Sequence, residues 1–233
     1  MAARPVWFFD LDNTLHDASN AIFAAIDRRM TDYVQERLAI GRPQADLLRR
    51  EYWLRYGATL IGLVRHHGVD ADHFLRQTHD FDIPALLSAE RGLRGLGRAL
   101  PGRKVLLTNS PLAYADEVLR GIGMRRHFAR RYAIEQQRLH GQWRPKPSVR
   151  MLRALLVRER LPAGRTGRRR AVLVDDNREN LRAAHRAGFA TVLVQREAAG
   201  AGGAGPRRVR AAHYLHARVR SVRQLPALAA RLR

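Results

Sequence analysis

The sequence predicts an α/β fold in which a doubly wound parallel sheet carries a helical block inserted behind its first strand. Four β-favouring apolar residues at 6–9 are typical of a buried strand. Later in the chain, short apolar runs alternate with helical patterns, which predicts parallel strands joined by right-handed crossovers. Between these regions, residues 17 to about 98 carry almost no strand signal.

The inserted block predicts several helices. Apolar residues recur at helical spacing over 22–38, with Ser19 as the expected N-cap and a break at 41–43. Gly68 is expected to end a later helix, because glycine readily takes the left-handed conformation found after helices. The other predicted helices of this block cover residues 47–56, 59–66, 71–77 and 83–100.

The second half of the chain alternates strand and helix patterns. Ser110 is the expected N-cap of the first helix here, and Gly188 is expected to end the third. The Gly/Ala-rich segment 198–206 is expected to be a flexible loop. The predicted strands cover 104–108, 132–134, 171–174, 191–194 and an edge strand at 212–215, and the predicted helices cover 111–122, 147–160, 177–187 and 225–232.

Composition limits the class of protein. The chain has 233 residues and 45% hydrophobic residues, enough for one large domain or a core with a smaller insert. The absence of cysteine excludes disulfides, zinc–thiolate sites and cysteine nucleophiles, and fits a reducing compartment. We expect a cytoplasmic protein without a signal peptide or membrane span, because no apolar run approaches about 20 residues.

The formal net charge of +22 predicts attraction to anions. Two of the 43 basic residues are lysine, Lys104 and Lys146, so the other 41 are arginine. Short arginine clusters occur at 168–170 and 207–208, but no aromatic-interleaved basic strip or nucleic-acid motif is present. We therefore interpret the charge as a bias towards arginine with general anion attraction, and do not expect nucleic acid as a partner.

Two carboxylates, Asp10 and Asp12, stand where the first strand is expected to end. Ligands of open α/β sheets bind at the carboxyl ends of strands. Side chains alternate along a strand, so the two carboxylates act together only if the backbone turns, and Asn13 and Thr14 favour a turn. This arrangement favours a metal ion and an anionic substrate.

Two further polar segments are candidates for the same site: residues 108–110, after an expected strand, and Lys146, in an expected loop. At 108–110, a hydroxyl, backbone N–H groups and a helix N-terminus form a potential anion site, although a simple capped turn explains the same residues. Lys146 lies between two prolines in a chain that otherwise uses arginine, which indicates a need for a compact point charge. The alternative is an exposed loop lysine.

A second carboxylate pair, Asp175 and Asp176, ends another apolar strand. Adjacent carboxylates repel one another unless a cation lies close by. Asp176 and Asp10 could share Mg²⁺, a hard cation that prefers oxygen ligands. The alternative, compatible with the first, is that Asn177 caps the following helix and the aspartates favour its positive end.

Together these segments resemble the four motifs of the haloacid dehalogenase (HAD) superfamily. The ordered motif residues are Asp10–Thr14, Thr108, Lys146 and Asp175–Asp176, and their surroundings fit over nearly the whole chain. Segments 8–17, 52–60 and 78–81 are similar to the pyrimidine 5′-nucleotidases of that superfamily. The resemblance implies a Rossmann-like core over residues 1–16 and 101–233, with an all-helical cap over 17–100.

The resemblance also implies residue roles for a two-step phosphoryl transfer. Asp10 is the implied nucleophile, which forms an aspartyl-phosphate, and Asp12 the implied general acid and base. Asn13, Thr108 and Asn109 are implied to hold phosphate oxygens, and Lys146 to neutralise the charge of Asp10 and the phosphoryl group. The implied Mg²⁺ ligands are Asp10, the Asp12 backbone carbonyl and Asp176, with Asp175 as a ligand or as a support beside the metal together with Asn180.

Asp12 also separates two activities within the superfamily. The dehalogenases attack carbon, need no acid for the leaving group and lack an aspartate at this place, so no dehalogenation is expected. The implied activity is instead that of a Mg²⁺-dependent phosphomonoesterase, a 5′-nucleotidase-like hydrolase. Its expected small-molecule substrate is a nucleoside 5′-monophosphate, with pyrimidine nucleotides foremost. A phosphatase for a sugar phosphate or another metabolite is the alternative. A basic nucleic-acid-binding protein on the same scaffold is a third, disfavoured by the intact motif residues.

Substrate choice is expected to lie in the cap, because lid closure excludes water and supplies specificity. The candidate residues for substrate contacts are His16, Asp17, Trp53, Arg55, Tyr56 and His79. For the aromatic residues the alternative is simple packing between cap helices. The sequence leaves the oligomeric state open.

Overall fold

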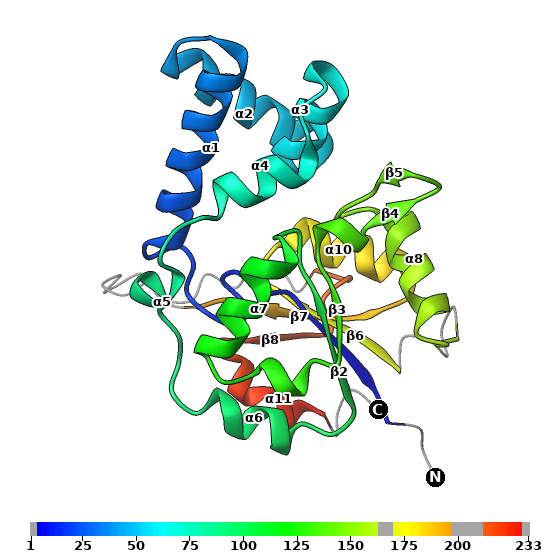
Figure 1. Cartoon of the computed structure of the whole chain (residues 1–233). Coiled ribbons are helices and arrows are strands. Elements are labelled where there is room, and N and C mark those ends of the chain that lie inside the picture. The colour runs from blue at the N-terminus through cyan, green and yellow to red at the C-terminus, as the bar shows by residue number, and fades with distance from the viewer. Residues whose placement is uncertain (1–3, 163–169, 197–211, 230–233) are drawn as a thin grey trace.

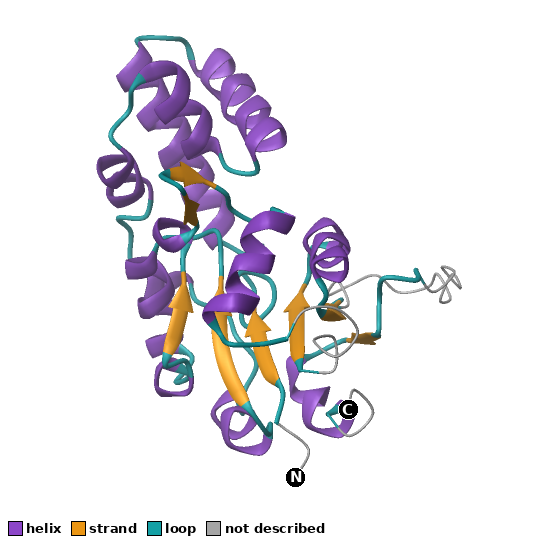
Figure 2. Ribbon diagram, turned by 90° about the vertical axis from the view of Figure 1, so that its right-hand side faces the viewer, coloured by secondary structure: helices purple, strands orange, loops and turns teal. Residues whose placement is uncertain are grey.

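The computed structural model describes residues 4–162, 170–196 and 212–229. Six parallel strands form one sheet in the order β3-β2-β1-β6-β7-β8, as Figure 2 shows from the side. The α/β prediction is therefore confirmed. The strands are β1 (Val6–Phe9), β2 (Arg103–Leu107), β3 (Arg130–Tyr132), β6 (Ala171–Asp175), β7 (Ala190–Val194) and β8 (Ala217–Val219).

The register of the three central strands brings their carboxyl ends to one level. Phe9 of β1 lies opposite Leu106 of β2 and Val174 of β6. Asp10 therefore leaves β1 close to where β2 and β6 end. Because all strands run in parallel, the polar residues that follow them gather at the same edge of the sheet.

Both faces of the sheet are buried, because side chains alternate along each strand. Trp7 and Phe9 point into a cluster with α7 (Leu112–Gly121), α5 (Ile83–Leu86), α6 (Leu93–Ala99) and α11 (Leu225–Leu228). Val6 and Phe8 point to the opposite face, towards α8 (Val149–Arg158) and α10 (Arg178–Ala187). Helices on both faces explain why the strands are apolar throughout.

A separate helical layer stands above the carboxyl edge of the sheet (Figure 1). Its own core includes Tyr33, Leu63 and Phe74, and two residues that follow β3 in the chain, Ile134 and Trp143, pack with it. This contact joins the helical layer to the sheet layer. The four helices are α1 (Ile22–Leu38), α2 (Arg42–Tyr56), α3 (Thr59–His67) and α4 (Ala71–Thr78).

Several local predictions are wrong. Ser19 does not cap α1, whose N-cap position is Ala21, because the Ser19 hydroxyl is engaged by the side chain of Asn13. The single helix expected over 83–100 is two helices, α5 and α6, and the second begins after Gly92 with a φ of 86°. The expected edge strand at 212–215 is a turn, and the edge strand is β8 instead.

Other short elements were not predicted. A hairpin of β4 (Arg138–Leu139) and β5 (Gln142–Trp143) interrupts the chain before Lys146. The predicted strand 132–134 is shifted, because Ile134 already begins a turn of 3₁₀ helix, η2 (Ile134–Gln136). Two more 3₁₀ turns are η1 (Arg125–His127) and η3 (Val222–Gln224). The predicted loop 198–206, the arginines at 168–169 and 207–208, and the end of the last predicted helix lie outside the described residues.

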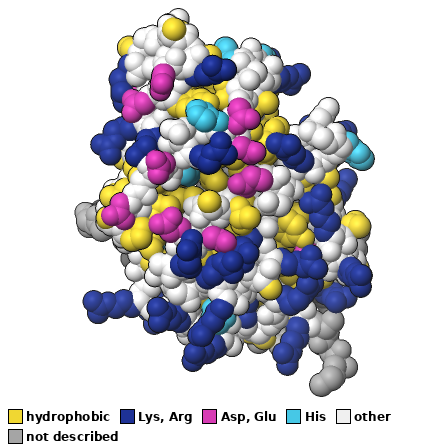
Figure 3. Space-filling view, viewed as in Figure 1, with side chains coloured by type: hydrophobic (Ala, Val, Ile, Leu, Met, Phe, Trp, Pro, Cys, Tyr) yellow, Lys and Arg dark blue, Asp and Glu magenta, His cyan; other side chains and the backbone are white. Residues whose placement is uncertain are grey.

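Charge is unevenly spread over the surface. In Figure 3, lysine and arginine cover much of the lower part of the visible face, whereas aspartate and glutamate gather across its middle. Asp72, Asp80, Glu117 and Glu135 line one hollow between α4 and α7. Within the described ranges, no helix combines the length and the apolar character needed to cross a membrane.

Candidate active site

The candidate active site is built around Asp10, the residue that follows β1. The Lys146 ammonium lies 2.7 Å from Asp10 Oδ1 and 2.8 Å from Asp175 Oδ2. The Thr14 hydroxyl donates to the other oxygen, Asp10 Oδ2, at 3.1 Å. Lys146 is 3% exposed, so this is a desolvated ion cluster rather than the exposed loop lysine considered above.

Asp10, Asp175 and Asp176 each offer one carboxylate oxygen, and these oxygens lie within 4.8 Å of one another. Burial raises the pKa of Asp10 well above its ordinary value; Lys146 opposes the rise, and Asp175 and Asp176 add to it. Burial, followed by repulsion from Asp175, raises the pKa of Asp176 to about 6. Three crowded carboxylates against one ammonium favour a bound divalent cation, and oxygen-only donors fit a hard ion.

Asp175 is held in place by α10, whose N-terminus faces the site. The Asn177 backbone N–H donates to Asp175 Oδ1 at 2.8 Å, and Asn180 Nδ2 lies 3.1 Å from both carboxylate oxygens. The Asn177 side chain caps α10 by accepting from the backbone of Glu179 and Asn180. Asn177 therefore caps α10 and also positions the Asp175 carboxylate, so the two interpretations of this segment are compatible.

Asp12 faces a different set of partners. Its Oδ1 accepts from Tyr114 Oη at 2.6 Å and contacts His16 Nε2 at 2.9 Å, while its Oδ2 accepts from Ser110 Oγ at 2.6 Å. Burial alone would raise the pKa of Asp12, but these hydrogen bonds and the nearby imidazole outweigh it and lower the pKa. The Asp12 carboxylate thus has partners of its own and is not among the three carboxylates whose oxygens lie close together.

Asn13 lies in the turn that follows Asp12. It takes a left-handed φ of 58°, a conformation that asparagine tolerates better than most residues. Its Oδ1 accepts from the Ser19 backbone N–H at 3.0 Å, which fixes the chain as it leaves the sheet.

The segment after β2 is tied to the Lys146 segment. Asn109 pairs with the backbone of Lys146 in both directions, at 3.0 Å each. The buried Gln137 donates to the Thr108 carbonyl at 2.6 Å and accepts from the Lys146 backbone N–H at 3.1 Å. Thr108 is 1% exposed, and its hydroxyl accepts from the Ser110 backbone N–H. These bonds fix Lys146 although it lies in a loop.

These contacts correct the expectation that Ser110 caps α7. The N-cap position belongs to Pro111, and the Ser110 hydroxyl is used by Asp12. Sequence reasoning also missed Tyr114 and Gln137. The only signal for Tyr114 was its spacing of four from Ser110, which places the two on one side of a helix start. Gln137 has no motif signal at all.

The family comparison agrees with this geometry. Residues 6–188 match the family described as haloacid dehalogenase-like hydrolase. This match covers most of the chain. The chain belongs to this family. The prediction that it is a hydrolytic enzyme with the HAD fold is thereby confirmed.

Solved structures of HAD proteins share the fold of the whole chain. An HAD phosphatase from Thermococcus onnurineus has a TM-score of 0.60 at 16% identity, with 96% of this chain and 97% of that one covered. The L-2-haloacid dehalogenase from Xanthobacter autotrophicus has a TM-score of 0.57 at 16% identity, with 98% and 99% covered. Phosphatases and dehalogenases share this fold, so the fold alone does not choose between the two reactions.

One curated relative of this HAD-like hydrolase is phosphate metabolism protein 8 of Saccharomyces cerevisiae. The two are 24% identical over 201 residues, which is 82% of this chain. The match covers 61% of the yeast protein, so the chain spans about three fifths of the length of that relative.

The HAD-like site opens into a cavity of about 540 Å³ beneath the helical layer, which we call the inner chamber. Asp10, Asp12, Thr108, Lys146 and Asp176 line it from the sheet side. From the helical layer it is lined by Phe23, Met30, Arg49, Trp53, Phe74 and His79. Arg49 was not among the predicted substrate contacts. Its Nη1 lies 2.6 Å from Oδ1 of Asp27.

The residues predicted to contact the substrate lie in different places in this HAD-like hydrolase. Trp53 and His79 line the inner chamber, whereas Arg55 and Tyr56 line a neighbouring hollow. His16 is fully buried against Asp12 and lines neither space. Asp17 lines neither space either, and its backbone N–H donates to the Ser88 carbonyl at 2.7 Å.

Proposed function

We propose that this HAD-type phosphatase is a Mg²⁺-dependent phosphomonoesterase of nucleoside 5′-monophosphates, with pyrimidine nucleotides preferred. The observation that carries the proposal is the separation of two carboxylates. Asp10 lies with Lys146 and the acidic group, and Asp12 lies with three hydrogen-bonding side chains. This separation supports a division of roles in which Asp10 attacks phosphorus and Asp12 exchanges protons.

The donor set fits Mg²⁺. Asp10, Asp176 and the backbone carbonyl of Asp12 would hold the ion, with Asp175 as a ligand or as a support beside it. When bound, the ion supplies positive charge against the phosphoryl oxygens and the nucleophile, which otherwise repel one another. The pKa of Asp10 is raised by burial, so the ionised nucleophile requires compensating charge.

We assign both steps of the reaction to residues of this chain. An Asp10 oxygen bonds to phosphorus while the bond from phosphorus to the leaving oxygen breaks. Asp12 must be protonated for this step, although its contacts lower its pKa, and it gives that proton to the leaving oxygen. Water then attacks the aspartyl-phosphate, Asp12 takes the proton of the water, and phosphate leaves with Asp10 restored. Thr108, Asn109 and Asn13 would hold the phosphate oxygens, and Lys146 would offset their charge.

Specificity for a nucleotide rests on the inner chamber. Its roof combines apolar and aromatic side chains, including Phe23 and Trp53, with Arg49. A planar base suits the aromatic surfaces, and an arginine donor suits a pyrimidine carbonyl. The similarity to a yeast protein named for phosphate metabolism supports a phosphate substrate for the shared part of the chain.

We also propose the division into a core over 1–16 and 101–233 and a cap over 17–100, in a cytoplasmic protein. The helical layer over the chamber supports a cap role for α1–α4. Helices α5 and α6, within the proposed cap range, pack on the sheet cluster instead. A sharper division would therefore leave these two helices with the core.

A phosphate-release panel tests the function. The full chain is assayed with UMP, CMP, purine nucleotides and sugar phosphates, with Mg²⁺ and with EDTA. We expect UMP or CMP to give the highest kcat/KM, EDTA to abolish turnover and Mg²⁺ to restore it. A sugar phosphate at the head of the panel would reject the nucleotidase proposal in favour of a metabolite phosphatase, and turnover that resists EDTA would reject the metal.

A further inference from the structure

A second cavity adjoins the inner chamber, and the proposed function leaves it unused. This outer chamber has a volume of about 890 Å³ and lies between α2, α3, the β4–β5 hairpin and the N-terminus of α10. Both chambers share a wall. The residues that line both are Trp53, Gly57, Asn109, Lys146, Asn177 and Asn180.

The shared wall is tightly built at Gly57, the residue that ends α2. Gly57 takes a φ of 81°, and an added Cβ would lie 3.2 Å from the Lys146 carbonyl oxygen. The helical layer therefore contacts the active-site loop at this point. A ligand that extends from Lys146 past this contact enters the outer chamber.

Three aromatic rings line the outer chamber. Trp53 and Tyr56 come from α2, and Trp143 comes from the hairpin. Trp53 is 55% exposed, an unusual exposure for a large aromatic side chain. The Arg138 guanidinium lies 3.8 Å from the centre of the Trp143 ring and braces the hairpin. Tyr56 and Trp143 are partly buried against the helical core, so both rings are held in place where they line the chamber. Rings held in this way are suited to stacking with a planar group.

The charge of the outer chamber is predominantly positive. Arg55, Arg65 and Arg144 line it, against one acidic side chain, Glu179. Arg144 donates to the neutral Gln142 at 2.6 Å, and Arg65 lies 5.9 Å from the centre of the Tyr56 ring. Among the described residues, neither Arg65 nor Arg144 has a carboxylate within ion-pair distance. Their charge is available to an anion.

Resting on the nucleotidase proposal, we propose that the outer chamber binds a second nucleotide unit of a 5′-phosphorylated dinucleotide. The first unit occupies the inner chamber with its 5′-phosphate at Asp10. The linking phosphodiester meets Arg65 and Arg144, and the second base stacks on Trp143 and Tyr56. Rings together with unpaired arginines are the pattern that binds short single strands. The proposal concerns a small ligand and does not require a surface for longer nucleic acid.

The test compares three substrates of the full chain with Mg²⁺: UMP, uridine 3′,5′-bisphosphate and a uridine dinucleotide with a 5′-phosphate. We expect kcat/KM for the dinucleotide to exceed that for UMP by about fivefold or more, since stacking of one base contributes that much. The bisphosphate, which has the second anion but no second base, is expected to fall between them.

Variants of two arginines test whether the higher kcat/KM for the dinucleotide comes from the outer chamber. Arg144→Gln and Arg65→Gln are each expected to bring the dinucleotide-to-UMP ratio of kcat/KM close to one. Arg29→Gln is the matched control, because Arg29 is exposed on α1, lines neither chamber and loses the same charge. A wild-type ratio near one, or a gain that both chamber variants retain, overturns the proposal. A bisphosphate gain equal to that of the dinucleotide overturns its stacking part.

A binding measurement separates this proposal from the function on which it rests. If UMP is not hydrolysed, the nucleotidase proposal fails and rate ratios are lost with it. Tryptophan fluorescence is then titrated with the dinucleotide, in wild type and in Trp143→Phe. This measurement tests whether the outer chamber binds the second nucleotide unit. Quenching that is reduced in Trp143→Phe supports the chamber, and quenching that is absent or unchanged overturns it.

Discussion

The Lys146 ammonium lies 2.7 Å from Asp10 Oδ1, although 136 residues separate the two in sequence. Asp175, on a third segment, accepts from the same ammonium at 2.8 Å. The proposed chemistry depends on this convergence, because a buried carboxylate attacks an anionic phosphoryl group only where positive charge is fixed beside it.

Replacing Lys146 with arginine tests the shape of that charge. Lys146→Arg keeps the charge but places a planar fork where a compact ammonium bridges two carboxylates. We expect kcat to fall by about 100-fold or more. Lys104→Arg, the same change at the other lysine, should retain activity, because Lys104 lines neither chamber and donates to the backbone carbonyls of Leu100 and Gly102. Phosphate release by both variants at saturating UMP provides the comparison, and equal rates would refute the point-charge argument.

Replacing Asp10 with asparagine should abolish turnover without loss of stability. The folded-state pKa of Asp10 is raised, so its ionised form opposes folding at neutral pH when no cation is bound. We expect the Tm of metal-free Asp10→Asn to equal or exceed that of wild type. Added Mg²⁺ should raise the Tm of wild type more than that of the variant. Near-normal turnover, or an equal Mg²⁺ shift, would contradict the roles given to Asp10.

Tyr114→Phe should impair the proton transfer of Asp12. The variant removes the 2.6 Å hydrogen bond to Asp12 Oδ1 and leaves those from His16 and Ser110. Loss of a hydrogen bond to a charged group costs about 1.5–3 kcal/mol, so kcat/KM for UMP should fall by about tenfold or more. Hydrolysis of p-nitrophenyl phosphate, whose leaving group needs no proton, should fall less. An equal loss with both substrates would show that Tyr114 acts only on structure.

Much of the fold could be predicted from the sequence where local signals and packing agree. The apolar runs at β1, β6 and β7 and the stop at Gly188 match the structure closely. Predictions failed where a tertiary contact competes with a local preference. Ser19 and Ser110 have the chemistry of helix caps, but Asn13 and Asp12 use their hydroxyls. The β4–β5 hairpin has two residues in each strand, too few for a pattern to show.

In the candidate site, too, some residues could be predicted from the sequence and others could not. Residues that follow strands, such as Asp10 and Asp176, are marked by position, and the structure brings them together. Contacts in the helical layer depend on how helices pack, which no motif records. His16 was expected near the substrate because it follows Asp12 closely, but the chain turns it into the interior. Arg49 carries no sequence signal and lines the chamber through the orientation of α2.

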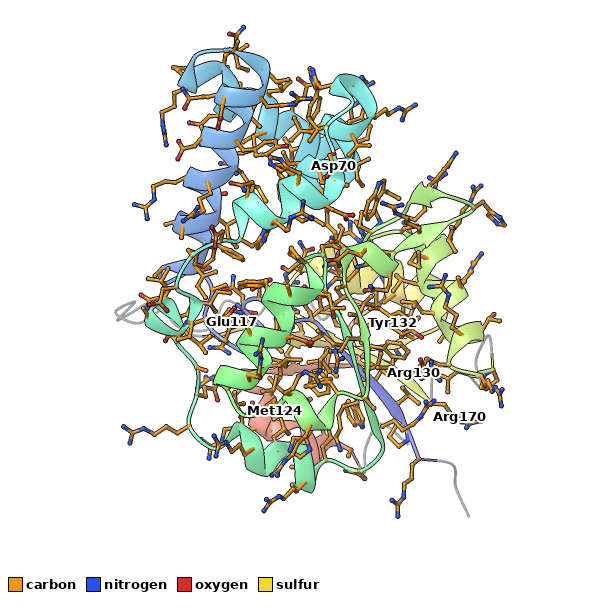
Figure 4. The ribbon with its side chains drawn as sticks, viewed as in Figure 1. Asp70, Glu117, Met124, Arg130, Tyr132 and Arg170 are labelled. Atoms are coloured by element: carbon orange, nitrogen blue, oxygen red, sulfur yellow. The ribbon has the colours of Figure 1, made fainter. Side chains whose placement is uncertain are left out.

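A buried carboxylate far from the chemistry should matter for stability. The Glu159 side chain is fully buried, accepts from Tyr132 Oη at 2.7 Å and pairs with Arg103 at 2.8 Å. The Nε of Arg130 lies 3.5 Å from Oε1 of Glu159; Arg130 and Tyr132 are labelled in Figure 4. Glu159→Ala should lower the free energy of unfolding by about 2 kcal/mol, because a buried hydroxyl loses its partner. Urea unfolding measures this loss, with exposed Glu36→Ala as the control; equal effects of the two changes would refute it.

His79 should make stability depend on pH. Burial lowers the pKa of His79 from its ordinary value of 6.5 to about 4. Between these values the unfolded chain binds a proton that the folded chain does not, so this contribution is complete above 6.5 and declines as pH falls towards 4. The loss of unfolding free energy between pH 7 and 4.5 should be smaller in His79→Gln by about 2 kcal/mol. A His79→Gln curve parallel to that of wild type would contradict the shift.

The central claim, that Asp10 carries the phosphoryl group during turnover, is tested most directly by trapping. Wild type is mixed with UMP and Mg²⁺, quenched in acid within milliseconds, reduced with borohydride and mapped by mass spectrometry. We predict that Asp10 alone is reduced, in an amount that depends on UMP, and that Asp10→Asn shows no modified residue. Rapid phosphate release with Asp10 unmodified, or modification of another carboxylate, would contradict the account.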